Sequence, residues 1–292
     1  MHGEKARPRG TLGVLALALG LASGIAGCSG DAGTGDVKFT TWGEDYIEKQ
    51  IPAADFADGW SIHYNKFLVV IGAIRIADDA DVSAGEMEGT KLVNHVSPGV
   101  KEIYTFKGLE AKAWRKVSYQ IRPAAGDTEA GTGATADDLA MMKMNKFSVY
   151  VEAEATKGDV KKSYHWGFGV PTAYVDCKGD KDGKETSGVI VTNGGVDTVE
   201  LTIHGDHLYY DDLQAQNAKR RFDAIADADK DMDGTITVDE LTAEKLVAID
   251  PMKGAYGTGA ASNIDDLGAY VRALSRTVGH FRGEGECFAT DP

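Results

Sequence analysis

Residues 60–76 read WSIHYNKFLVVIGAIRI, and apolar side chains occupy every second position along most of this stretch. Such alternation is typical of a β-strand with one buried face, because successive side chains of a strand point to opposite faces. The alternation changes phase between Tyr64 and Phe67 and again near Gly72. One extra residue in a strand has this effect, so we expect β-bulges or a turn at these two places rather than a helix.

Shorter strand-like runs follow along the chain, separated by turns rich in Gly, Asp and Lys. Many short strands at close spacing are typical of an antiparallel sandwich or barrel. We therefore predict a mostly β fold, with an antiparallel β-sandwich over residues 37–207. The runs that support it are residues 103–106, 116–121, 147–153, 161–168, 173–177, 188–192 and 198–203.

The spacing of apolar residues becomes helical after residue 203. Residues 208–292 should therefore form a helical segment that packs on the sandwich within one compact unit. The expected helices cover residues 211–228, 240–249 and 263–281, and Pro251 ends the second of them.

The composition limits the possible classes of protein. The chain has 292 residues, of which 42% are hydrophobic, which is enough for a buried core and excludes wholesale disorder. The formal net charge is −14. Because an acidic surface repels phosphates, we expect no nucleic-acid partner.

The N-terminal segment has the anatomy of a secretory signal peptide. Residues 1–10 carry three basic residues and one acid, and residues 11–22 are an uncharged apolar run. This run is too short for a bilayer span, which needs about 20 residues. The segment ends in Ile25-Ala26-Gly27-Cys28, which resembles the lipobox of bacterial lipoproteins.

The lipobox resemblance implies that residues 1–27 are removed and that Cys28 carries diacylglycerol and an added acyl chain such as palmitate. Two or more acyl chains anchor a protein without a transmembrane helix, so the lipid is the one expected contact with the membrane. Residues 28–36 would form a flexible tether. Ser29 replaces the Asp that retains enterobacterial lipoproteins at the inner membrane, which favours the outer membrane of the cell envelope. The alternative is an ordinary signal peptide cut nearby, with Cys28 left as a thiol.

Two further cysteines, Cys177 and Cys287, remain after lipidation of the first. Export favours the persistence of disulfides, so we predict a bond between them that ties the C-terminal tail to the middle of the chain. The alternative is two unrelated buried thiols.

Residues 229–240 read DKDMDGTITVDE, and this run resembles the calcium loop of the EF-hand family at every diagnostic position. Ca²⁺ takes six to eight oxygen ligands, and Gly234 stands where the loop turns sharply. The resemblance implies calcium ligation by Asp229, Asp231, Asp233, Thr235 through its carbonyl, Thr237 directly or through water, and Glu240.

EF-hands usually occur in pairs, and the sequence contains no second matching loop. A lone EF-hand is more often a structural clamp than a sensor, so we expect calcium to fix the angle between two flanking helices. Carboxylates clustered without an ion repel one another, so the loop should become ordered on binding. The alternative is an acidic surface loop.

A second candidate metal site contains histidines. His204 and His207 flank a strand-to-loop junction, His165 lies on an earlier strand, and His280 lies near the end of the chain. Imidazole and carboxylate groups suit Zn²⁺ or Cu²⁺. Residues three apart on a strand face opposite ways, so a turn at Gly205 is required to bring the pair together. The alternative is that these histidines are capping, hydrogen-bonded or merely exposed.

The β-rich layout with His and Trp also resembles the methanobactin-associated periplasmic copper-binding proteins, without a motif that matches residue by residue. No catalytic serine elbow, zinc-protease helix or phosphate-binding glycine loop is present in the sequence. We therefore expect a non-catalytic, lipid-anchored, calcium-binding envelope protein, with calcium structuring the C-terminal helices. The alternatives are a periplasmic copper- or zinc-binding lipoprotein that uses the histidines and, third, a hydrolase without a recognisable motif.

Overall fold

The computed structural model describes residues 33–181 and 183–292. The predicted signal peptide and Cys28 lie outside these residues. The first strand, β1, spans Thr34–Trp42, so the last three residues of the predicted tether belong to a strand. Among the described helices, none has the length and apolar character needed to cross a membrane.

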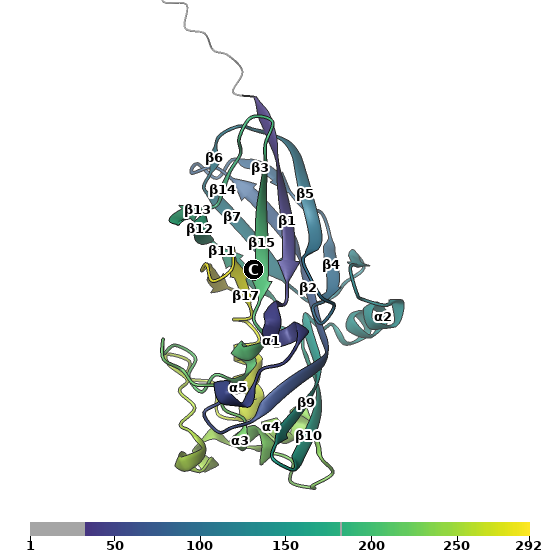
Figure 1. The fold of residues 1–292 in the computed structure, drawn as a ribbon, viewed down its shortest axis with the longest axis vertical. Coiled ribbons are helices and arrows are strands. Elements are labelled where there is room, and N and C mark those ends of the chain that lie inside the picture. The colour runs from purple at the N-terminus through teal and green to yellow at the C-terminus, as the bar shows by residue number, and fades with distance from the viewer. Residues whose placement is uncertain (1–32, 182) are drawn as a thin grey trace, which may run out of the picture. The chain divides into compact units, whose positions relative to one another are not determined.

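The described part of the chain is mostly β, as predicted (Figure 1). One large sheet has the order β17-β15-β1-β5, and the other has the order β16-β10-β9-β2-β7-β11-β18, with β3 and β4 on β2 and β8 on β4. The strands that follow β1 are β2 (Ser61–Ala77), β3 (Ser83–Glu86), β4 (Thr90–Asn94), β5 (Lys101–Glu110), β6 (Ala113–Trp114), β7 (Lys116–Ile121), β8 (Thr128–Ala130), β9 (Val149–Lys157), β10 (Val160–Phe168), β11 (Thr172–Val175), β12 (Lys178–Lys181), β13 (Lys184–Ser187), β14 (Val189–Ile190), β15 (Val196–Ile203), β16 (Thr235–Ile236), β17 (Gly279–Phe281) and β18 (Phe288–Thr290).

Strand β2 is the alternating stretch and lies in the middle of the larger sheet, between β9 and β7. Its pairing register shifts between Tyr64 and Lys66 on the β9 side and between Gly72 and Arg75 on the β7 side. The two predicted irregularities are therefore confirmed. They bend one long strand so that it pairs with different neighbours along its length.

Most strand pairs are antiparallel, but β1 and β15 pair in parallel over seven residues of each strand. This pair departs from the predicted antiparallel sandwich. The two strands lie far apart in the sequence, so no hairpin turn forces them to run in opposite directions. Buried side chains of both sheets form one core, which includes Phe39 of β1, Ile71 of β2 and Leu201 of β15.

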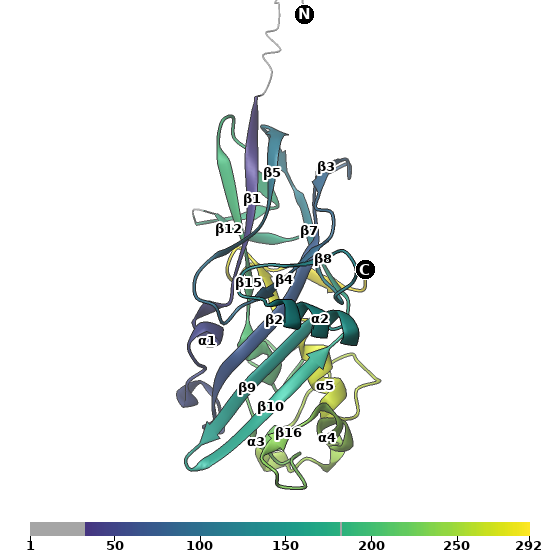
Figure 2. The same ribbon diagram turned by 90° about the vertical axis from the view of Figure 1, so that its right-hand side faces the viewer.

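The C-terminal third contains short helices where long ones were predicted, so the predicted helix lengths are wrong. Figure 2 shows the β9–β10 hairpin beside the region of α3 and α4. The described α-helices are α1 (Glu44–Glu48), α2 (Ala136–Asn145), α3 (Asp223–Ala226), α4 (Val238–Ala243) and α5 (Leu267–Leu274), and the 3-10 helices are η1 (Ala53–Asp55), η2 (Gly205–Tyr209), η3 (Leu246–Ala248) and η4 (Pro251–Lys253).

Two of these differences in helix length have a visible cause, one in local hydrogen bonds and one in the pairing of a distant strand. Asp211 accepts a hydrogen bond from the Lys219 backbone N–H at 2.7 Å, and Asp212 accepts one from the Gln214 N–H at 2.8 Å. Aspartate side chains that bond nearby backbone groups compete with helix formation. The last predicted helix ends early because the chain beyond α5 forms β17, which pairs with β15.

The disulfide between Cys177 and Cys287 is present, as predicted. It joins the segment after β11 to the segment before β18, and these two strands also pair with each other. The C-terminal tail is therefore attached to the larger sheet both covalently and by a strand ladder.

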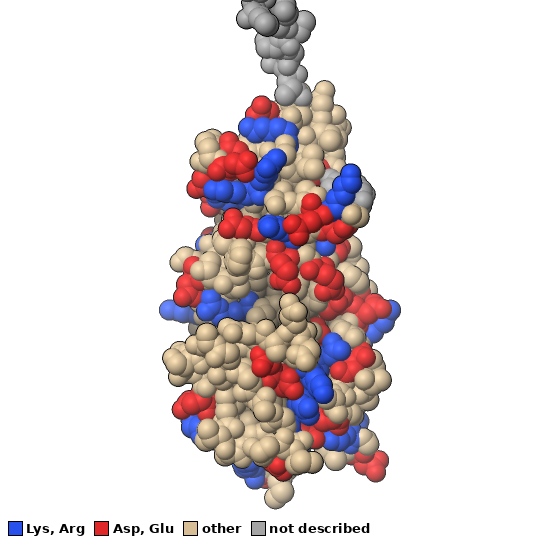
Figure 3. Space-filling model, turned by 90° about the vertical axis from the view of Figure 1, so that its left-hand side faces the viewer, with Lys and Arg blue, Asp and Glu red and all other residues tan. Residues whose placement is uncertain are grey.

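Acidic and basic side chains are interspersed on the face of the molecule seen in Figure 3. Many acids have a basic partner, such as Asp206 with Arg220 and Asp197 with Arg282. In the described residues, buried carboxylate oxygens without a hydrogen-bond partner occur on Glu44, Asp58, Asp206 and Asp229. Three of these four lie at the two candidate metal sites.

Candidate metal sites

Three histidines meet where β15 ends. His204 follows β15 directly, His207 lies in η2, and His280 lies on β17, next to β15. The ring centroids are 4.2 Å apart for His204 and His280, 5.0 Å for His207 and His280, and 5.2 Å for His204 and His207. We call these three residues the histidine cluster.

The turn that brings His204 and His207 together depends on Gly205, as expected from the sequence. A Cβ atom at this position would lie 2.6 Å from Ile47 Cγ1 and 2.9 Å from Tyr64 Cε2. Real Cβ atoms essentially never approach another heavy atom so closely, so a larger residue would push the turn away from the core. The turn also leaves the His207 Nδ1 atom 3.1 Å from the Thr277 hydroxyl, which holds this ring in place.

Three carboxylates surround the histidine cluster. The ligand atoms of Asp206 lie within 4.8 Å of those of His204 and His207, and the Glu284 carboxylate lies within the same distance of His204 and His280. Glu44 Oε1 lies 3.4 Å from His204 Nδ1. Glu44 is the first residue of α1, two residues after the end of β1, and has a left-handed φ of 47°, which is uncommon for a residue with a side chain.

Several polar atoms of this site are buried and have no hydrogen-bond partner. They include His204 Nε2, His280 Nδ1 and Asp206 Oδ1, on residues that are at most 8% exposed. Buried polar groups are rarely left unpaired in native proteins, because each costs free energy comparable to a lost hydrogen bond. Unpaired atoms that converge from separate elements are what a bound cation would satisfy.

The protonation states also favour a cation. Burial lowers the pKa of His207 to about 4, and burial followed by repulsion from His280 lowers the pKa of His204. Both rings are therefore neutral at pH 7, which is the form that binds a metal ion. Without an ion, burial followed by repulsion from Asp206 raises the pKa of Glu44 to about 8, so this carboxyl holds its proton at pH 7, and a bound cation would favour its charged form.

His207 lines a cavity of about 410 Å³ together with Tyr210, Gln214 and Thr277, so one ring of the cluster borders a surface cavity. His165 is not part of the cluster. It lies exposed on β10 and lines a different surface cavity, beside Met141 and Thr237. The structure therefore brings three of the four candidate histidines together, and the predicted place of His165 in this site is wrong, because its strand lies in the other sheet.

The predicted calcium loop curls around three of its expected ligands. Ligand atoms of Asp229, Asp231 and Glu240 lie within 4.8 Å of one another. Left-handed backbone at Met232 (φ 62°) and Gly234 (φ 85°) produces the curl. The entering helix α3 has four residues and the leaving helix α4 has six, so the flanking helices are much shorter than predicted.

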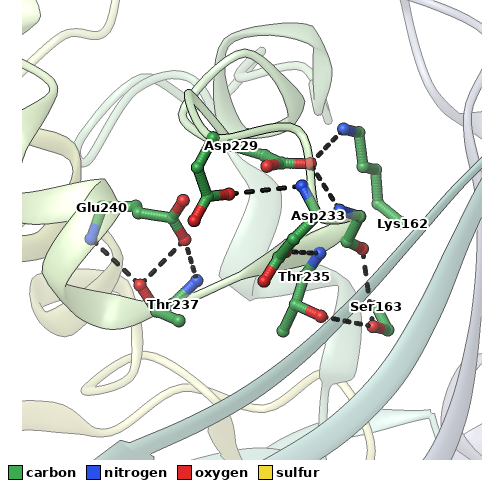
Figure 4. Close-up of polar contacts among 9 residues, drawn as sticks. Lys162, Ser163, Asp229, Asp233, Thr235, Thr237 and Glu240 are labelled. Atoms are coloured by element: carbon green, nitrogen blue, oxygen red, sulfur yellow. Dashed lines mark hydrogen bonds and ion pairs between the residues drawn. The ribbon is translucent and has the colours of Figure 1, made fainter.

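The other expected ligands make local hydrogen bonds in the loop (Figure 4). Asp233 accepts a hydrogen bond from the Thr235 N–H at 2.6 Å. The Thr237 hydroxyl and N–H both donate to Glu240 Oε2 at 2.8 Å, in a capping box at the start of α4. The Oδ1 atom of Asp229 is buried without a partner, which fits a cation ligand at the first loop position.

A row of buried aromatic side chains runs from the calcium loop to the turn of the histidine cluster. Trp166 Nε1 donates to the Ile236 carbonyl at 2.9 Å, and the Trp166 ring stacks on Tyr164 with centroids 4.0 Å apart. The Tyr164 hydroxyl contacts that of Tyr209, which lies 2.8 Å from the Tyr64 hydroxyl. Tyr64 in turn donates to the Gly205 carbonyl at 2.7 Å. Packed side chains thus connect the two sites without a gap.

Comparison with known proteins adds little. No family model matches the chain, and no curated protein matches it. A solved structure of MbnP from Methylosinus trichosporium is similar over 60% of this chain and 76% of that one, at 10% identity and a TM-score of 0.33. A similarity this low carries no inference about fold or function, so the proposals below depend on the residues of the two sites.

Proposed function

We propose that this chain is a non-catalytic, lipid-anchored protein of the bacterial cell envelope that binds Cu²⁺ or Zn²⁺ in the histidine cluster. The observation that supports it best is the convergence of three imidazole rings with buried, unpaired nitrogens on His204 and His280. Leaving such atoms unsatisfied would destabilise the fold, whereas a metal ion would use them.

The ligand chemistry points to a divalent ion. The two candidate ligand groups contain imidazole nitrogens and carboxylate oxygens and no sulfur. Thiolate and thioether ligands select Cu(I), whereas imidazole with carboxylate suits Cu²⁺ and Zn²⁺. In the proposed site His204, His207 and His280 bind the ion, with Asp206 or Glu284 completing the shell. Glu44 Oε1 lies 3.4 Å from His204 Nδ1; beside a bound ion it would be charged and would accept the Nδ1 hydrogen, which leaves Nε2 to the metal.

Metal analysis tests this proposal. The full chain, purified from the envelope fraction of producing cells without chelator or added metal, should contain copper or zinc at about one ion per chain. A His204→Ala/His207→Ala pair should lose it. Equal copper or zinc contents in the wild type and the double variant would show that the cluster does not hold the metal.

A second, structural role is proposed for Ca²⁺ in the loop at residues 229–240. The close approach of Asp229, Asp231 and Glu240 supports it, together with the unpaired Asp229 oxygen. The same metal analysis should then detect one calcium per chain. Because calcium is plentiful outside the cytoplasm, an affinity on the order of 10⁻⁴–10⁻³ M is sufficient. Absence of calcium binding even at millimolar supply would remove this part of the proposal.

The lipid anchor is proposed from the lipobox sequence. Cells that produce the chain and are grown with labelled palmitate should incorporate the label, and a Cys28→Ala variant should not. The wild type should fractionate with outer membranes. Labelling of the Cys28→Ala variant, or absence of label in the wild type, would contradict lipidation at this cysteine.

A further inference from the structure

A lysine contacts the first residue of the calcium loop. The Lys162 ammonium forms an ion pair with Asp229 Oδ2 (Figure 4). The Lys162 side chain is 16% exposed, and that of Asp229 is 0% exposed. Asp229 Oδ2 also accepts a hydrogen bond from the Gly234 N–H at 3.0 Å. A buried aspartate at the first loop position is therefore already paired with a positive charge from outside the loop.

The sheet fixes this lysine in place. Lys162 lies on β10, opposite Ala155 of β9, and the next residue, Ser163, pairs with Thr235 of the loop strand β16. The loop backbone is thus attached to β10 beside the lysine. Lys162 therefore stays near Asp229 unless its side chain changes rotamer, because its own strand pairs with the strand of the loop.

A calcium ion would need the same carboxylate. Asp229 presents its unpaired Oδ1 atom to the loop, where its ligand atoms lie within 4.8 Å of those of Asp231 and Glu240. An ammonium on the other oxygen of this carboxylate would lie only a few ångströms from a divalent ion. Like charges at such a distance repel strongly when they are screened by little water.

We propose that Lys162 is an internal competitor of calcium: it neutralises Asp229 while the loop is empty, and calcium binding displaces it. This inference depends on the proposed calcium role and extends it. Lys162 would hold the empty loop folded, whereas the sequence alone predicted carboxylates that repel one another until an ion binds. The same contact would lower the affinity of the loop for calcium, so that the loop fills only where calcium is abundant.

A pair of lysine variants tests the proposal. Lys162→Met removes the competitor, and Lys161→Met removes an exposed lysine from the adjacent position of the same strand with an identical change in net charge. In calcium titrations by calorimetry, Lys162→Met should bind calcium about 10-fold more tightly than Lys161→Met, which corresponds to about 1.4 kcal/mol. Without calcium, Lys162→Met should also melt at a lower temperature than the control, because Asp229 loses its partner.

The outcomes separate this inference from the proposed calcium role. If the wild type and both variants bind no calcium at millimolar concentration, the calcium role itself is refuted and the inference with it. If the wild type binds calcium but the two variants have equal affinities, calcium binding stands and competition by Lys162 is refuted. A weaker affinity in Lys162→Met than in the control would also refute it, since Lys162 would then be assisting the ion.

A measurement on the wild type does not depend on the folding of a variant. Amine-reactive labelling followed by mass spectrometry reports the accessibility of each lysine. Calcium should increase the labelling rate of Lys162 several-fold, because its ammonium is released from a buried carboxylate, and should leave that of Lys161 unchanged. Saturation with calcium without a change at Lys162 would overturn the displacement.

Discussion

The histidine cluster and the calcium loop differ in how the chain builds them. The calcium loop is one run of twelve residues, and its ligands approach because the backbone curls locally at Met232 and Gly234. The histidine cluster collects His204 and His207 from the segment after β15 and His280 from β17, and Glu44 approaches it from the end of β1, so only the folded sheet brings these residues together. A contiguous site can be recognised from its sequence, whereas a site assembled by the sheet depends on the whole fold. The experiments below ask whether the two sites behave as separately as their construction suggests.

The largest expected effect is the loss of Cu²⁺ or Zn²⁺ binding at the histidine cluster. His204 belongs to both candidate ligand groups, so His204→Ala should abolish stoichiometric binding of Cu²⁺ and Zn²⁺. Competition with a chromogenic chelator measures the affinity. His165→Ala is the matched control, because His165 lies on β10 outside the cluster and should leave the affinity unchanged. If calcium affinity fell together with zinc affinity in His204→Ala, the two sites would not be independent.

More of the calcium loop than of the histidine cluster could be predicted from the sequence, and the reason is physical. The spacing of oxygen ligands in residues 229–240 was enough to place Asp229, Asp231 and Glu240 together, because local backbone geometry decides their separation. For the cluster, the turn at Gly205 was predictable, and Asp206 lies between His204 and His207 in the sequence. Glu44 and Glu284 gave no signal, because their approach depends on the parallel pairing of β1 with β15 and on the position of the segment after β17.

The fold shows the same division between local and distant interactions. The register shifts of β2 were visible in its alternation, since a bulge changes the phase of the pattern itself. The lengths of the C-terminal helices were not, because Asp211 and Asp212 capture backbone N–H groups that a helix would use. The spacing of apolar residues indicates which face of a segment is buried. It does not indicate whether aspartate side chains compete with the helix for backbone N–H groups.

A somewhat smaller effect is expected on the calcium affinity of the loop at residues 229–240. Asp229→Ala should lower calcium affinity about 100-fold, because it removes the one buried carboxylate of the three grouped ligands. Calorimetric titration measures the affinity, and the zinc or copper content should stay at the wild-type level. Asp239→Ala changes an exposed residue at the eleventh loop position and serves as the control. A loss of calcium affinity as large in Asp239→Ala would mean that general negative charge, rather than ligation, attracts the ion.

The disulfide offers a test that should affect the sites unequally. Glu284 lies three residues before Cys287, whereas the calcium loop is attached to β10. A Cys177→Ser/Cys287→Ser pair should lower the free energy of unfolding by about 2–5 kcal/mol. At a temperature where this variant remains folded, zinc affinity should fall about 10-fold, and calcium affinity should hold. Equal losses at both sites would indicate a general loosening of the fold.

The smallest expected effect concerns pH and a histidine outside both sites. His95 is fully buried beside Thr41, and burial together with the charge of Lys101 lowers its pKa to about 3. In the unfolded chain the ring titrates near 6.5, so the unfolded state binds the proton that the folded state refuses. The stability contributed by neutral His95 is therefore complete above pH 6.5 and decreases as the pH falls from there towards 3.

Urea unfolding of the metal-free protein at pH 7.5 and pH 5 measures this loss of stability. The pKa of His207 is also lowered, so His207 contributes to the loss with the same sign. A His95→Gln variant should lose less stability between the two pH values than the wild type does. Saturating zinc should enlarge the loss of stability when the lower pH is 3.5, because His207 has a pKa of about 4 and would give up the ion only when it is protonated. An identical loss with and without zinc at pH 3.5 would mean that His207 does not bind the metal, and the contrast between the two sites would then weaken.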